Sequence, residues 1–286
     1  MIRLGGHGLP VGSEDPFAFA RAHVAFGYGA AYCPPATIGD TQRLADIEKA
    51  FAAVDVTIAE VGIWKNLITP DETVRKANLA IAAEKLAIAD AVGARCAISY
   101  IGSYKAGTDY APAGENFSQD AFDACVEVSR LLLDTVKPKR AKFTLEMMQY
   151  SVPDSPEGYR DLILAIDRPG FGAHFDPVNF VMTPRVYWDT GALIRECFEK
   201  LGQWVVSCHA KDVVLRQEPT SIHLDEIIPG KGELDYRTFL AELDRLPRQV
   251  PLMMEHLTDA EYADGRDAIY AAGDAVGVSF ANRRAA

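Results

Sequence analysis

Short apolar segments alternate along the chain with longer segments in which apolar residues recur at helical spacing. Eight segments of each kind follow one another, and several of the longer ones carry helix start and stop signals. The short segments predict strands at residues 2–6, 29–33, 56–62, 95–101, 142–147, 172–176, 205–210 and 251–255. Because each predicted strand is followed by a predicted helix, the pattern favours a parallel sheet.

Eight strand–helix units with no break in composition predict an α/β fold, a single (β/α)₈ TIM barrel that spans residues 1–286 as one domain. The alternative is an open, doubly wound sheet. That alternative is disfavoured because no G-x-G-x-x-G motif follows an early strand.

Two helix starts are marked by capping residues. In the segment 69–72, Thr-Pro-Asp-Glu, we expect Thr69 to be the N-cap of a helix that ends at Gly93. Ser155 followed by Pro156 predicts a second helix that begins in the same way.

Composition and charge narrow the class of protein. The chain has 286 residues, 49% of them hydrophobic, and 29 Lys and Arg against 40 Asp and Glu, a net charge of −11. Such an acidic chain is a poor nucleic-acid binder and gives no reason to expect an anionic membrane as partner. Five cysteines without a C-x-x-C pair, no signal-peptide pattern and no run of 18 apolar residues predict a soluble, cytoplasmic protein with reduced thiols.

Four consecutive predicted strands in the second half of the chain end in a similar way. At their ends, or one position before, lie Glu146, Asp176, His209 and Glu255. Side chains alternate between the faces of a strand, so each of these residues shares a face with the residue two positions before it. Taking that face as the barrel interior places beneath them Thr144, His174, Ser207 and Met253. We therefore expect the four strand ends to meet at one rim.

Three carboxylates that converge at a barrel mouth would repel each other and raise one another's pKa unless a cation lay among them. A divalent metal ion resolves this conflict. Oxygen ligands with one imidazole suit Mn²⁺ or Mg²⁺ better than a closed zinc site, although Co²⁺, Fe²⁺ and Zn²⁺ are compatible with the same ligand types. We expect one ion, with Mn²⁺ as the first choice.

Five motifs with the right order and spacing carry a resemblance to a known family. They are Thr144-Leu145-Glu146, His174-Phe175-Asp176-Pro177-Val178-Asn179, Cys208-His209-Ala210-Lys211-Asp212, Pro229-Gly230-Lys231-Gly232-Glu233-Leu234-Asp235-Tyr236 and Met254-Glu255-His256. With them the chain resembles the sugar phosphate isomerase/epimerase family with the xylose isomerase-like TIM barrel, which includes ketose 3-epimerases, hydroxypyruvate isomerase and inosose dehydratase. The resemblance implies that Glu146, Asp176, His209 and Glu255 hold one catalytic metal ion, and that Glu146 and Glu255 are also the acid/base pair.

Five further residues are candidates for substrate binding. Lys211 shares its predicted strand face with His209, and its ammonium group could meet a substrate oxygen or equally be solvated. Asn179 could bind a sugar hydroxyl or form a turn, and His7 ends the first predicted strand. Trp64 could stack on a sugar ring or simply pack, and His174 could orient the site or be an interior histidine.

These residues indicate a metal-dependent isomerase or epimerase that moves a proton beside the carbonyl of a ketose or related keto-sugar through an enediolate. The same parts would serve a lyase or dehydratase acting on a keto-sugar, a keto-glycoside or an inosose. An endonuclease IV-like phosphodiesterase is disfavoured by the 6 histidines and the net charge of −11, and a non-catalytic sugar-binding barrel would not need two glutamates at a metal. The expected partner is a small carbohydrate without a phosphate group, and a homo-oligomer is compatible with the sequence.

Overall fold

The computed structural model describes residues 1–9, 15–217 and 220–283. In these ranges eight parallel strands form one sheet with the order β1-β10-β7-β6-β5-β4-β3-β2. The strands are β1 (Arg3–Gly5), β2 (Ala30–Tyr32), β3 (Thr57–Gly62), β4 (Cys96–Ser99), β5 (Lys142–Glu146), β6 (Phe171–Phe175), β7 (Val205–Ala210) and β10 (Pro251–Met254). The predicted (β/α)₈ TIM-barrel fold is confirmed.

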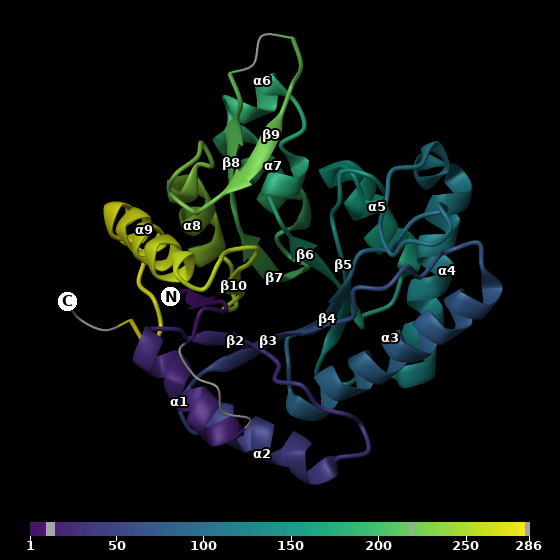
Figure 1. The fold of residues 1–286 in the computed structure, drawn as a ribbon, viewed down its shortest axis with the longest axis horizontal. Coiled ribbons are helices and arrows are strands. Elements are labelled where there is room, and N and C mark those ends of the chain that lie inside the picture. Colours follow the sequence, from purple (N-terminus) through teal and green to yellow (C-terminus); the bar gives the residue numbers. More distant parts are fainter. Residues whose placement is uncertain (10–14, 218–219, 284–286) are drawn as a thin grey trace.

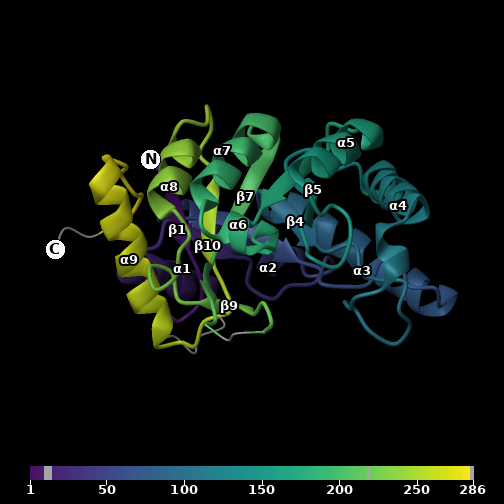
Figure 2. The same cartoon turned by 90° about the horizontal axis from the view of Figure 1, so that it is seen from above.

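Helices surround the strands (Figure 1). They are α1 (Pro16–Phe26), α2 (Thr41–Ala52), α3 (Glu72–Val92), α4 (Gln119–Val136), α5 (Pro156–Ile166), α6 (Pro184–Tyr187), α7 (Thr190–Leu201), α8 (Tyr236–Asp244) and α9 (Glu261–Val276), with short 3₁₀ turns at Gly114–Phe117 and Val178–Phe180. In the turned view α9 lies at one end of the molecule, beside the C-terminus, and α3 and α4 lie at the other (Figure 2). No helix in the described ranges is long and apolar enough to cross a membrane.

The barrel closes between β1 and β2, where the two strands approach closely. The amide of Gly29 donates a hydrogen bond to the carbonyl of Leu4 across this seam, at 2.9 Å. A Cβ on Gly5 would lie 2.5 Å from the carbonyl oxygen of Ala30, so only glycine fits at this position.

Outward-facing strand residues such as Phe143, Leu145 and Phe175 are buried against the helices in the main core. Inside the barrel a separate small cluster joins Met253 to Ala30 and Ala59. The remainder of the interior is polar, because Thr144, His174 and Ser207 are buried there. The interior therefore has an apolar part and a part where ionisable groups must find partners within the protein.

Helix capping follows the sequence in one case and not in the other. Ser155 caps α5 through its hydroxyl, with Pro156 in the first turn, as predicted. The cap of α3 is Asp71, whose carboxylate accepts from the amides of Thr73 and Val74, so the expectation for Thr69 is wrong. Thr69 is buried and still belongs to the preceding loop. The helix ends at Gly93 in the left-handed conformation, as expected.

A hairpin that the sequence did not predict follows β7. Its strands are β8 (Asp212–Leu215) and β9 (Leu224–Ile227), which pair antiparallel with each other in a separate two-stranded sheet. It projects from the barrel (Figure 1). The carboxylate of Asp212 anchors its base by accepting hydrogen bonds from the amides of Gly230, Gly232 and Leu234, at 2.8 to 3.0 Å.

Candidate metal centre and active site

A cavity of about 720 Å³ opens at the carboxyl ends of the strands. Its lining includes residues from most strands of the barrel and from the hairpin, namely His7, Tyr32, Cys33, Glu60, Gly62, Trp64, Tyr100, Tyr110, Glu146, Met148, Gln149, Asn179, Lys211, Glu226, Glu255 and His256. Functional groups of (β/α)₈ barrels gather at this face because the loops that follow the strands meet there.

The structure brings together the four predicted ligands at the base of this cavity. Glu146 ends β5, Asp176 directly follows β6, His209 lies in β7 and Glu255 directly follows β10. One ligand atom of each residue lies within 4.8 Å of those of the other three. The side chains of Asp176 and His209 are 0% exposed, and that of Glu255 is 12% exposed. The cluster is thus removed from water that could otherwise screen its charges.

Distances within the cluster suit a shared cation. His209 Nδ1 lies 2.9 Å from Glu146 Oε1 and 2.9 Å from Glu255 Oε1. Two ligand atoms that bind one ion at right angles, each about 2.1 Å from it, would be about 3.0 Å apart. Within the described chain, Asp176 Oδ2 and Glu255 Oε1 are buried without a well-oriented hydrogen bond. These donors and their spacing therefore fit a divalent metal ion.

The ammonium group of Lys211 places a positive charge among the carboxylates of the cluster. Its Nζ lies 2.8 Å from Asp176 Oδ2 and 2.7 Å from Glu255 Oε1, and its side chain is 4% exposed. Burial lowers the pKa of Lys211, but Asp176, Glu146 and Glu255 raise it well above its ordinary value. The lysine is therefore a fixed ammonium group at the cavity base.

The carboxylates titrate differently from one another. Burial raises the pKa of Glu146 more than Lys211 and His209 lower it. Burial also acts on Glu255, but His209 and Lys211 outweigh it and bring the pKa of Glu255 to about 2. Burial also raises the pKa of Asp176, but Lys211 and, after it, His209 outweigh burial and hold this pKa well below its ordinary value. The site thus contains two glutamates whose protonation is not equivalent.

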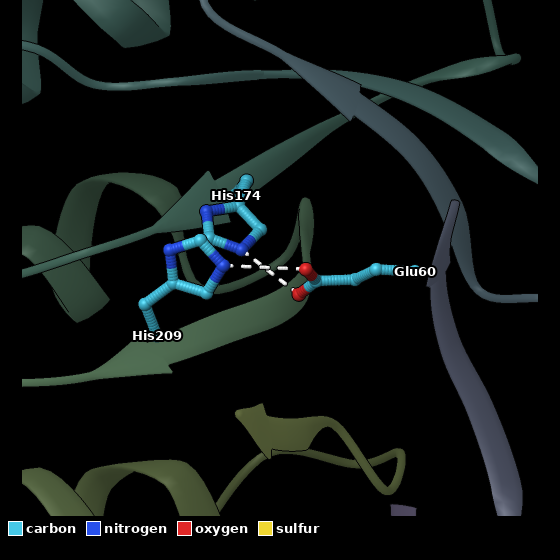
Figure 3. Close-up of side chains that lie close together, drawn as sticks. All are labelled: Glu60, His174 and His209. Atoms are coloured by element: carbon cyan, nitrogen blue, oxygen red, sulfur yellow. Dashed lines mark hydrogen bonds and ion pairs between the residues drawn. The ribbon is translucent and has the colours of Figure 1, made fainter. Parts of the chain in front are cut away.

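His209 is oriented by Glu60, a residue of β3 that the sequence analysis did not single out. The carboxylate of Glu60 faces the imidazole rings of both histidines (Figure 3), with Oε2 3.2 Å from His209 Nε2 and Oε1 3.0 Å from His174 Nε2. The hydroxyl of Ser207 donates to the same carboxylate. Burial opposes ionisation of Glu60, but His209 and His174 lower its pKa below the ordinary value. With its Nε2 hydrogen directed at Glu60, His209 would offer Nδ1 to the cluster.

The five substrate-binding candidates occupy different places. Lys211, Asn179, His7 and Trp64 line the cavity. Asn179 Nδ2 donates to Glu146 Oε1 at 3.2 Å and to the carbonyl of Met147 at 3.0 Å, so it holds Glu146 in place. His174 is completely buried beneath the cavity, where it contacts Glu60 and not the open space.

Aromatic rings form one wall of the cavity. The ring centroid of Tyr100 lies 5.8 Å from that of Trp64 and 5.3 Å from that of Tyr110. Tyr150, which does not line the cavity, lies behind with its ring centroid 5.5 Å from that of Tyr110. On the part of the lining that follows β1 and β2, next to β3, the ring of His7 is stacked on that of Tyr32 with 4.4 Å between the ring centroids. Such ring faces are suited to pack on the C–H faces of a sugar.

The hairpin contributes a carboxylate at the rim. Glu226 of β9 lies 3.4 Å from Lys211 Nζ and 2.8 Å from His256 Nδ1. His256, which the strand alternation predicts to point away from the site, follows the end of β10 with a φ of 60° and lines the cavity. The alternation does not extend past the strand, and this change of backbone conformation explains the difference.

The family model for the xylose isomerase-like TIM barrel matches residues 25–273, which confirms the resemblance read from the sequence. No curated protein matches the chain in sequence. Among solved structures, a D-psicose 3-epimerase from Clostridium cellulolyticum H10 has a TM-score of 0.67 at 13% identity, covering 97% of this chain and 98% of that chain. Endonuclease IV from Thermus thermophilus has a TM-score of 0.69 at 15% identity, covering 96% of this chain and 99% of that chain.

A third similar structure is described as a "probable 3-DHS dehydratase" from Bacillus anthracis. Its TM-score is 0.66 at 11% identity, covering 94% of this chain and 99% of that chain. The three proteins share a fold with this chain and differ in the reactions that their names give. The likeness therefore establishes the fold and leaves the reaction to the chemistry of the site.

Proposed function

This chain belongs to the xylose isomerase-like TIM barrel family, and we propose that it is a metal-dependent isomerase or epimerase acting on a ketose or a related keto-sugar. The observation that carries the proposal is the convergence of Glu146, Asp176, His209 and Glu255, with ligand atoms within 4.8 Å, at the base of a cavity of about 720 Å³. The proposed substrate is a small carbohydrate, which the aromatic wall would contact.

The four residues would hold one divalent ion, with Mn²⁺ as the first choice and Mg²⁺, Co²⁺, Fe²⁺ or Zn²⁺ as alternatives. When bound, the ion would act as a Lewis acid on the carbonyl and the neighbouring hydroxyl oxygen of the substrate. Asn179 and Glu60 keep Glu146 and His209 in the orientation that this requires. The oxygen-rich set with a single imidazole supports this choice of ions.

Glu146 and Glu255 would carry out the proton transfers. Glu146 ends β5 and Glu255 directly follows β10, and β6 and β7 separate these strands in the sheet, so the two side chains approach the cavity base from two sides. One carboxylate would remove the proton from the carbon beside the carbonyl, leaving an enediolate. The other would return a proton to the new position. The Lys211 ammonium lies at the same base and would stabilise negative charge on a substrate oxygen.

A second candidate is a lyase or dehydratase acting on a keto-sugar, a keto-glycoside or an inosose. The observation that favours it is the position of Lys211, whose Nζ lies 2.7 Å from Glu255 Oε1. An ammonium group next to the proposed base could donate a proton to a departing oxygen. An endonuclease IV-like phosphodiesterase remains disfavoured, because a three-metal site of that kind needs several more histidines. Among the described residues, the clusters of potential metal ligands contain two histidines, His174 and His209.

The test is an incubation of the Mn²⁺-loaded protein in D₂O with a panel of ketoses, inososes and 3-keto-glycosides, followed by NMR. We expect deuterium at the carbon beside the carbonyl in a product that is an isomer of the substrate. An unsaturated product would assign the second candidate function. If neither product forms with any member of the panel, the proposal is wrong.

A further inference from the structure

A second cavity, of about 620 Å³, lies at the amino ends of the strands. Its lining residues precede or begin β4, β5, β6, β7 and β10, including Arg95, Lys142, Phe171, Trp204 and Arg248. Because the strands are parallel, this cavity is at the opposite end of the barrel from the candidate metal centre.

This cavity is basic although the chain carries a net charge of −11. Its lining contains five cationic side chains, those of Arg95, Arg140, Lys142, Arg168 and Arg248, and one carboxylate, that of Asp167. A local excess of one sign inside a concave surface strengthens the potential there and attracts ions of the other sign.

Two of the five cations have carboxylate partners. Arg140 contacts Glu48 at 2.5 Å, and Arg168 contacts Asp134 at 2.8 Å. These pairs are exposed to solvent, and their charges are already balanced within the protein.

The other three cations have no carboxylate partner in the described ranges. Arg248 donates to the carbonyls of Gln203 and Val205, at 2.8 and 2.6 Å, and Lys142 donates to the carbonyl of Pro169. No side-chain hydrogen bond or ion pair of Arg95 occurs among the described residues. Among the described residues, the N–H groups of the Arg95 guanidinium therefore have no protein acceptor and can donate to a ligand.

The unpaired cations also repel one another. Burial and the neighbouring Arg3 lower the pKa of Arg95. Burial likewise lowers the pKa of Arg248, and Arg95 adds to this effect. An anion between Arg95 and Arg248 would relieve this repulsion.

One side of the same cavity is apolar. Leu164 of α5 is 58% exposed, and it lines the cavity together with Ile163, Phe171 and Trp204. An exposed leucine beside a partly buried tryptophan offers contact area for an apolar or aromatic group. The cavity thus combines an anion site with an apolar wall.

From this combination we infer that the amino end of the barrel binds a small phosphate ester whose organic part is apolar or aromatic. Guanidinium groups match phosphate oxygens with pairs of parallel hydrogen bonds, and Lys142 adds a third positive charge. The organic part would lie against Leu164 and Trp204. This site is separate from the candidate metal centre and does not depend on the function proposed for it.

The experiment is isothermal titration calorimetry of the full chain with phenyl phosphate, inorganic phosphate and phenol at low ionic strength. We expect saturable binding of phenyl phosphate with a dissociation constant below about 1 mM. Inorganic phosphate should bind more weakly because it lacks the apolar part, and phenol should not bind because it lacks the charge. Absence of saturable binding by phenyl phosphate would overturn the inference.

Variants locate the binding. Arg95→Gln combined with Lys142→Gln should weaken phenyl phosphate binding at least about tenfold, because two unpaired cations are removed. The matched control is Arg168→Gln, which removes a cation of the same cavity that Asp134 already balances, and it should weaken binding less than threefold, roughly the effect of a screened charge. Circular dichroism and thermal unfolding verify that each variant is folded.

The candidate metal centre could also attract phosphate, so the titration is repeated after EDTA treatment. Binding that persists in EDTA and is lost in the double variant supports the inference. Binding that EDTA abolishes places the ligand at the candidate metal centre and refutes the inference. Binding that the double variant retains at full strength also refutes it, because the cations of this cavity then do not hold the ligand.

Discussion

At the carboxyl ends of the strands the barrel gathers carboxylates around His209, whereas at the amino ends it gathers arginines and Lys142 around a second cavity. The acidic groups are buried, with side-chain exposures of 0% for Asp176 and 5% for Glu146. The basic groups are more accessible, and Arg140 has a side chain that is 45% exposed. The two ends thus differ in the sign of their charge and in how deeply the charged side chains are buried.

This difference in depth determines how strongly each end requires a counter-ion. Buried carboxylates are not screened by water, so their repulsion must be balanced by Lys211, by protons or by a bound cation. Half-exposed arginines are solvated in the absence of a ligand. The folded chain therefore does not require a bound anion at this end. We therefore expect substitutions at the carboxyl end to have large effects and ligand binding at the amino end to be weak.

The largest effect is expected from removal of the proposed acid/base groups. Glu146→Gln and Glu255→Gln keep the shape of the side chain but cannot accept a proton, and each should lower kcat by about 10²-fold or more. The matched control is Glu226→Gln at the rim of the same cavity, which should retain most of the turnover. Near-native kcat in either of the first two variants, at saturating Mn²⁺ on a confirmed substrate, would show that the chemistry belongs to other groups.

Metal binding should stabilise the folded chain. An ion that binds only the folded state adds about 2.7 kcal/mol to the free energy of unfolding at 100 times its dissociation constant. Thermal unfolding with and without Mn²⁺ measures this difference, and elemental analysis should give about one ion per chain. His209→Ala should remove both effects. An unchanged Tm on adding Mn²⁺ to the native sequence would contradict the metal centre.

Glu60→Gln tests the orientation of His209. The amide keeps the size of the side chain but loses the negative charge that faces Nε2, and metal affinity should fall about 10- to 100-fold, the usual cost of losing such a partner. Calorimetry with Mn²⁺ gives the affinity. Glu60→Gln with native affinity would mean that His209 is held by packing alone.

Metal affinity should decrease as the pH falls. Burial lowers the pKa of His209, but Glu255, Glu60 and Glu146 raise it well above its ordinary value, so the metal-free ring carries a proton that an ion must displace from Nδ1. Below that pKa, affinity should fall by up to about tenfold per pH unit for each proton released. Titrations in two buffers of different ionisation enthalpy count the protons. Equal affinities at about pH 6 and about pH 8 would refute this coupling.

The smallest effect is expected in α3, which connects the two ends outside the barrel. Asp71→Ala removes the acceptor of the amides of Thr73 and Val74 and should lower the free energy of unfolding by about 1 kcal/mol. Asp71→Asn, which keeps an acceptor, should change it little. Urea unfolding of the two variants decides, and metal affinity should be the same in both.

The sequence was informative where several elements repeat one pattern. Glu146, Asp176, His209 and Glu255 could be brought together in advance because each lies at or next to the end of a strand, and strand alternation needs no knowledge of long-range contacts. Glu60 could not be found by the same rule, because it lies inside β3, two residues before the strand ends at Gly62. A lone glutamate in an apolar strand was the available signal, and its partners come from β6 and β7, far along the chain.

Other differences have local causes. The segment 69–72 contains two residues able to cap a helix, and the packing of the loop before α3 decides between Thr69 and Asp71. The hairpin after β7 was not predicted, although the run Val213-Val214-Leu215 is typical of a strand. This run pairs with residues 224–227, and the strand propensity of one segment does not specify which other segment it pairs with.

The hairpin of β8 and β9 is attached to the site without being part of the sheet that builds it. Within the described chain its strands pair with each other alone, and β8 begins two residues after β7 ends. Among its described residues, Glu226 contacts Lys211 and His256 at the rim of the cavity. The hairpin is therefore an exchangeable module. Grafting a hairpin of another length or charge between Asp212 and Ile227 should change which small molecules the cavity binds, while the barrel and the arrangement of its carboxylates remain the same.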